Sequence, residues 1–78
     1  MTISKMAEEI VQAGATIMVD SMFVMVKVPV DEMYDGTLYG QDPIAYKCHN
    51  GDILQAFEDV VITAHARIDE IKEIARSY

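Results

Sequence analysis

The sequence contains one cysteine, no tryptophan, four glycines and two prolines in 78 residues. The single cysteine, Cys48, excludes an intrachain disulfide, so stability has to come from side-chain packing or from a partner. The scarcity of glycine and proline, together with a hydrophobic fraction of 51%, excludes disorder as the main interpretation. We therefore expect residues 1–78 to form a single folded domain with a thin core, located in the cytoplasm.

Basic residues are also scarce: there are six lysines and arginines against thirteen aspartates and glutamates, and the formal net charge is −7. This charge repels nucleic-acid phosphates and anionic membrane surfaces, so we expect no direct nucleic-acid binding and no membrane binding. It favours a positively charged surface on another protein. The alternative is that the negative charge only keeps the protein soluble.

Motifs that would indicate an enzyme or a metal site are absent from the sequence. It has no glycine-rich phosphate loop and no G-x-S-x-G, H-E-x-x-H or paired C-x-x-C motif. Its soft metal ligands are Cys48, His49 and His65, and on a strand the first two would point to opposite faces. We therefore expect no enzymatic activity, no metal and no cofactor, with acid–base chemistry by a histidine and a carboxylate as the alternative.

The first part of the chain predicts a helix followed by a strand. Apolar residues recur at helical spacing from position 6 onward, with Ser4 as the candidate N-cap and Glu9 on the outer, polar side. Gly14 is one possible end of this helix, and an end at about Asp20 is the other. Alternating apolar residues over 22–30 then predict a strand whose even positions face a layer of helices.

The rest of the chain predicts further strands and a long helix. Residues 31–43 have the composition of turns, with a short strand predicted at 37–39, and residues 44–48 predict another strand. From Asp52 to Ser77 apolar residues recur in steps of three and four, which indicates one helix. The predicted fold class is α+β: an N-terminal helix, a small antiparallel sheet of two or three strands, and a long C-terminal helix.

The predicted C-terminal helix is longer than the domain that carries it. It would extend ~39 Å, whereas a compact chain of this length is roughly 30 Å across. Because an unbroken helix would leave apolar residues uncovered, we expect a homodimer in which a second copy covers them. The alternative is a helix interrupted near Thr63, with both halves on the same sheet. The residues predicted for the dimer share one apolar stripe: Val61, Ala64, Ile68, Ile71 and Ala75.

Two acidic surfaces are the candidate sites for a protein partner. The segment after the predicted strand combines negative charge with tyrosines, a composition found in protein contact surfaces. On the C-terminal helix, Asp69 and Glu73 are spaced to form ion pairs with Lys72 and Arg76. The candidate residues are Asp31, Glu32, Tyr34, Asp35 and Tyr39 in the segment, and Asp69, Glu70 and Glu73 on the helix. The alternative for the segment is a solvated turn whose tyrosines fold back onto the sheet.

The function most compatible with these features is binding to a larger basic host protein or complex. In its small size, acidity and lack of enzyme motifs, the chain resembles the inhibitors that bacteriophages use against host systems, anti-CRISPR proteins among them. This resemblance is one of general character and implies an inhibitor that occupies a basic groove and excludes DNA or RNA from it. The alternative is a dimeric module that binds or sequesters a small ligand in a pocket between subunits, lined by Tyr34, Tyr39, Tyr46 and His65.

Overall fold

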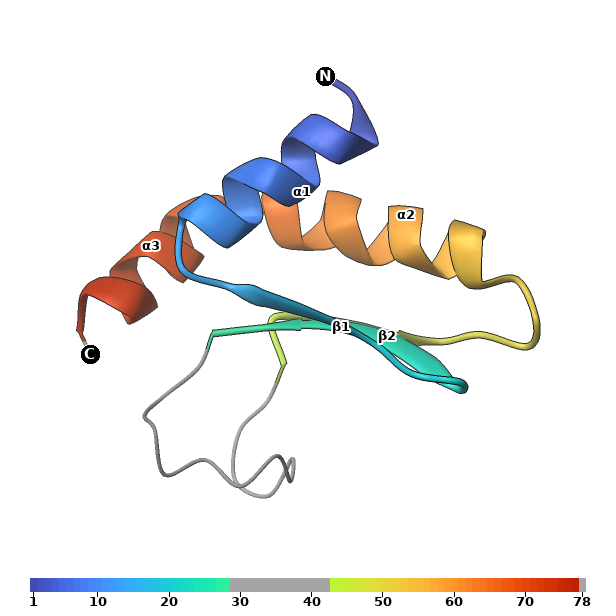
Figure 1. Cartoon of the computed structure of the whole chain (residues 1–78). Coiled ribbons are helices and arrows are strands. Elements are labelled where there is room, and N and C mark those ends of the chain that lie inside the picture. The colour runs from blue at the N-terminus through green and yellow to red at the C-terminus, as the bar shows by residue number, and fades with distance from the viewer. Residues whose placement is uncertain (29–42, 78) are drawn as a thin grey trace.

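The computed structural model describes residues 1–28 and 43–77, which form three helices and three strands (Figure 1). The expected α+β class, with an N-terminal helix and a small antiparallel sheet, is confirmed. None of the helices in the described residues is long and apolar enough to cross a membrane. In chain order the elements are α1 (Ile3–Gln12), β1 (Thr16–Val19), β2 (Phe23–Lys27), β3 (Ala45–Cys48), α2 (Ile53–His65) and α3 (Ile68–Arg76).

The sheet is antiparallel, with β2 between β1 and β3. The helices lie together on one side of it (Figure 1). The alternation along β2 turns Val24 and Val26 toward the helices, where they join a buried cluster with Ile10 of α1 and Val61 of α2. The sequence predicts that the even positions of this strand face the helices, and Val24 and Val26 do so. Met25, on the opposite face of β2, is fully buried as well.

The N-terminal end of α1 differs from the prediction, and its C-terminal end decides between the two predicted alternatives. Thr2 is the N-cap, because its hydroxyl accepts a hydrogen bond from the Lys5 amide at 3.2 Å, and the predicted cap, Ser4, lies inside the helix. The helix ends before Gly14, whose φ of +115° is a conformation that side chains with a Cβ rarely adopt. The alternative end at about Asp20 is therefore wrong, and β1 occupies that part of the chain.

The strand predicted at 22–30 is shorter in the structure. Met22 is 69% exposed because it lies in the turn between β1 and β2. In this turn the Asp20 amide donates to the Phe23 carbonyl at 2.8 Å, and the Asp20 carboxylate accepts from the Met22 amide at 3.2 Å. The strand predicted at 44–48 is present as β3, and the one predicted at 37–39 lies outside the described residues.

The prediction of one unbroken C-terminal helix is wrong, because Ala66 and Arg67 separate α2 from α3. Arg67 has φ −111° and ψ 25°, and its Nη1 donates to the carbonyl of Ile44, just before β3, at 2.5 Å. Its Nε and Nη2 donate to the two carboxylate oxygens of Glu70 at 2.9 and 2.6 Å. These bonds hold the interruption against the edge of the sheet. The interruption that the alternative predicts is thus observed, shortly after Thr63, and α2 packs on β2 and β3 of the sheet.

The apolar stripe predicted for a dimer lies against the core of the same chain. Three of its residues, Val61, Ala64 and Ile71, have an exposed fraction of 0%, while Ile68 and Ala75 are half-buried. Because the break folds α3 back onto the rest of the chain, no second copy is needed to cover these side chains. The homodimer stays a prediction, but this stripe and the length of the helix no longer support it.

Candidate functional site

The exposed side of α3 carries the acidic residues that the sequence predicts for a partner. Asp69, Glu70 and Glu73 are all exposed. The Arg67 guanidinium donates hydrogen bonds to Glu70 and so holds the pKa of that carboxyl below its usual value. The carboxylates of Asp69 and Glu73 have no hydrogen-bond or ion-pair partner in the described part of the chain. These two carboxylates are therefore the ones left available to another molecule.

The buried side of α3 fixes this acidic face in place. Ile71 has no exposed surface, and Ile74 and Ala75 are packed against the core cluster. The predicted ion pairs of Asp69 with Lys72 and of Glu73 with Arg76 are absent from the described structure. Free carboxylates on a packed helix can bind a cationic group without first breaking an internal pair.

Several predicted residues are not brought together by the described structure. Tyr46, on β3, lines a small hollow beside α2, whereas His65 lines a different cleft next to α1. These two members of the predicted ligand pocket therefore do not share a site within one chain. The acidic segment, and with it the two other tyrosines of that pocket, lies outside the described residues: Asp31, Glu32, Tyr34, Asp35 and Tyr39.

Cys48 and His49 make separate contacts at the end of β3. The Cys48 Sγ lies 2.8 Å from the hydroxyl oxygen of Tyr46, two residues earlier on the same face of the strand. The His49 Nε2 lies 3.1 Å from the carbonyl oxygen of Asp20 in the neighbouring turn, so the imidazole donates from this nitrogen. Within residues 1–28 and 43–77, no group of three or more His, Cys, Asp or Glu side chains could hold a metal ion.

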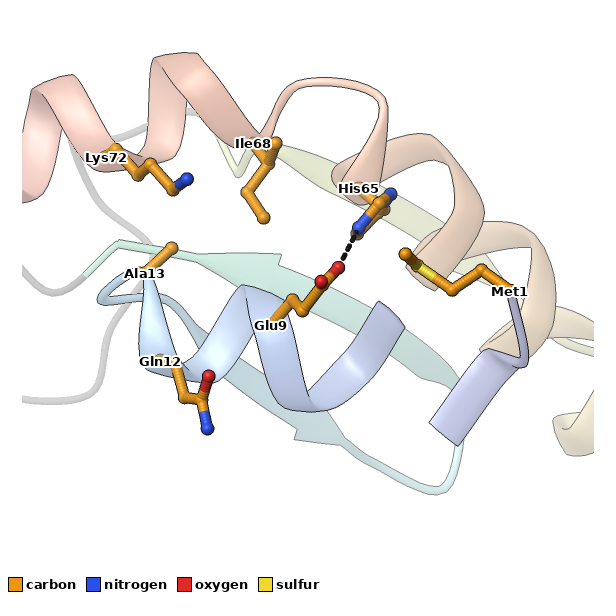
Figure 2. Close-up of a pocket in the computed structure, with 7 residues that line it drawn as sticks. All are labelled: Met1, Glu9, Gln12, Ala13, His65, Ile68 and Lys72. Carbon is orange, nitrogen blue, oxygen red and sulfur yellow. Dashed lines mark hydrogen bonds and ion pairs between the residues drawn. The ribbon is translucent and has the colours of Figure 1, made fainter. Parts of the chain in front are cut away.

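A cleft of about 450 Å³ opens between α1 and the junction of α2 with α3 (Figure 2). We call it the α1–α3 cleft. On its C-terminal wall, His65 ends α2, Ile68 begins α3, and Lys72 follows one turn later. Ile68 and Lys72 are four residues apart and so lie on one side of α3, and His65 lines the same cleft from the end of α2. Its lining residues are Met1, Glu9, Gln12 and Ala13 from one wall and His65, Ile68 and Lys72 from the other.

A histidine and a carboxylate meet across this cleft. His65 Nε2 and Glu9 Oε2 are 2.6 Å apart, and their side chains are 22% and 32% exposed (Figure 2). The expectation that Glu9 lies on the outer, polar side of its helix is therefore wrong, because packing of α1 against α2 turns it inward. The contact joins the first helix to the last residue of α2. It also satisfies both charges when the imidazole is protonated.

The remaining groups of the cleft are a lysine, a glutamine and apolar side chains. The Lys72 ammonium has no partner in the described part of the chain, and Figure 2 shows its side chain extending toward the space between the walls. Ile68 and Ala13 add half-buried apolar surface. The lining residues include no serine, threonine or cysteine that His65 and Glu9 could activate as a nucleophile.

Sequence reasoning did not predict that Glu9 and Lys72 line the same cleft. Each stands on an amphipathic helix where several acidic and basic residues have similar exposure, and nothing in the spacing distinguishes them. The one available signal was His65, an ionisable residue at the edge of an otherwise apolar stripe.

No protein-family model, curated protein or solved structure matches this chain.

Proposed function

We propose that this protein is a binding protein that inhibits a larger, basic partner by occupying the surface with which that partner holds DNA or RNA. Its net charge of −7 supports this proposal, because opposite charge raises the rate and selectivity of encounter with a cationic groove. The small size and acidity are those of the phage inhibitors that the sequence resembles. The unpaired and exposed Cys48 suits a reducing compartment, so we place the activity in the cytoplasm.

The observation that carries the proposal is the pair of free carboxylates on α3. Asp69 and Glu73 are one helical turn apart, exposed, and without an internal partner in the described residues. The helix beneath them is anchored by the fully buried Ile71. A rigid acidic face loses little conformational entropy when it binds, so it is suited to dock on lysine and arginine side chains.

The first test replaces the two α3 carboxylates with lysines. We expect Asp69→Lys/Glu73→Lys to lose a basic protein that the parent captures from a bacterial lysate at about 0.05 M salt and releases at about 0.5 M. The captured protein should also lose nucleic-acid binding when the parent chain is titrated into it. The matched control is Glu8→Lys/Glu58→Lys, which makes the same change of charge on other helices and should retain capture.

The second test addresses the acidic segment, which lies outside the described residues. Replacing Asp31, Glu32 and Asp35 with lysines should abolish capture of the same partner while the melting temperature stays unchanged. The proposal is wrong if the captured protein is not basic, or if it still binds nucleic acid in the presence of excess parent chain. It is also wrong if the lysine variant of α3 and the lysine variant of the acidic segment both capture the partner as well as Glu8→Lys/Glu58→Lys does.

A further inference from the structure

The α1–α3 cleft has the size of a small-molecule site. Its volume of about 450 Å³ lies within the range of roughly 300–1,000 Å³ that is typical of ligand pockets. Its two walls belong to α1 and to the broken C-terminal helix, which packing and the Glu9–His65 contact hold together. The site is therefore formed by secondary-structure elements before any ligand arrives, which lowers the entropic cost of binding.

The charges in the cleft select an anion. The Glu9 carboxylate lies 2.6 Å from His65 Nε2, so its Oε2 is already engaged in a contact within the protein. Lys72 is not compensated: its ammonium has no partner in the described part of the chain, although Asp69 stands three residues before it on the same helix. Figure 2 shows the Lys72 side chain directed along the cleft. A bound cation would be repelled by this ammonium, whereas a carboxylate would pair with it.

The apolar surface of the cleft selects an organic anion over an inorganic one. Ile68 and Ala13 face each other across the space beside Lys72 and are half-buried (Figure 2). An aliphatic chain lying between them would remove their remaining apolar surface from water, which inorganic phosphate or sulfate cannot do. We propose that the α1–α3 cleft binds a small organic carboxylate, with its charged end on Lys72 and its apolar end between Ile68 and Ala13. This binding activity is separate from the inhibitor function proposed above.

The test compares ligands of equal length and opposite charge. Hexanoate, titrated into the folded protein by calorimetry and by amide NMR, should bind saturably and shift the amides of Ala13, Ile68 and Lys72. Hexylammonium should not bind, because Lys72 repels it, and acetate should bind more weakly than hexanoate, because it lacks the apolar chain. The substitution Lys72→Met, which removes the ammonium group, should raise the Kd of hexanoate about tenfold or more.

The control variant is Arg76→Met, which removes one positive charge from the same helix at a residue that does not line the cleft. It should leave the Kd of hexanoate within about twofold of the parent, a difference well under 1 kcal/mol. Lys72 is exposed, so its replacement leaves the core intact, and the amide spectrum of each variant reports whether it is folded. The proposal is overturned if hexylammonium binds as tightly as hexanoate or if Lys72→Met binds hexanoate like Arg76→Met. It is also overturned if no saturable binding occurs below about 10 mM, the range of non-specific contact.

Discussion

Gly14 is the residue at which the chain leaves α1 and turns into β1, and it has two separate reasons to be a glycine. Its φ is +115°, and a Cβ at this position would stand 2.6 Å from the Cβ of Ala75 in α3. We expect Gly14→Ala to lower the free energy of unfolding by about 2–4 kcal/mol, because backbone strain and overlap with α3 add. Urea denaturation followed by circular dichroism measures this loss.

Gly51 provides the control for Gly14, because it has a similar φ of +92° but no atom within 4 Å of an added Cβ. Gly51→Ala should therefore show the strain alone, a loss of about 1–2 kcal/mol. The difference between the two alanine variants measures the close approach of α3 to the corner of α1 and β1. Equal losses would mean that α3 does not dock there.

At the scale of elements, Arg67 holds α3 in place after the break by contacts to Ile44 and Glu70. The guanidinium lowers the pKa of Glu70 from its usual value of 4.5. A carboxyl with a lowered pKa in the folded state stabilises that state above pH 4.5, and this stabilisation disappears as the pH falls through the lowered pKa. The free energy of unfolding of the parent should thus exceed that of Glu70→Gln near neutral pH, and the difference should shrink in acid.

The same comparison in an Arg67→Gln background isolates the ion pair. Without the guanidinium, Glu70→Gln should produce no pH-dependent difference in the free energy of unfolding, because the cause of the lowered pKa is gone. Both side chains are partly exposed, so the effect in the parent is expected to be small and to weaken with added salt. A pH-dependent difference that persists without Arg67 would contradict this assignment.

The type of most elements could be predicted from sequence, but the ends and contacts of those elements could not. The apolar alternation of β2 and the helical spacing after Asp52 are local patterns, and they correctly predicted a strand and helical structure there, although the strand is shorter than predicted and the helix is broken. The break at Arg67 has no local signal, because no glycine or proline lies in α2 or α3. It depends on a contact with the Ile44 carbonyl, 23 residues earlier in the chain.

The candidate site was predictable only in part, for the same reason. The acids of α3 were found because exposure of charged residues follows from the amphipathic pattern. The cleft was not found, because which helix faces which is decided by tertiary packing. Glu9 shows this most clearly: the pattern of its own helix places it outside, whereas its contact with His65 bridges 56 residues of sequence.

At the scale of the whole molecule, the break between α2 and α3 decides how the apolar surface is covered. One long helix would have presented its stripe to a second copy, while the broken one buries Val61 and Ile71 in one core cluster with residues of the strands and α1. These two arrangements make opposite predictions about the effect of protein concentration. Stability that depends on a second copy rises with concentration, and stability that comes from the core of one chain does not.

Val61→Ala tests which arrangement operates in solution, because Val61 belongs to the predicted dimer stripe and has an exposed fraction of 0% in the single chain. As a large-to-small change in a core, it should lower the free energy of unfolding by about 2–3 kcal/mol. This loss should be the same at two protein concentrations about a hundredfold apart, as measured by urea midpoints. A parent midpoint that rises with concentration, and a variant midpoint that does not, would instead assign Val61 to an interface between copies. The fold of the single chain, in which Ala66 and Arg67 let α3 return to the core, requires the first result.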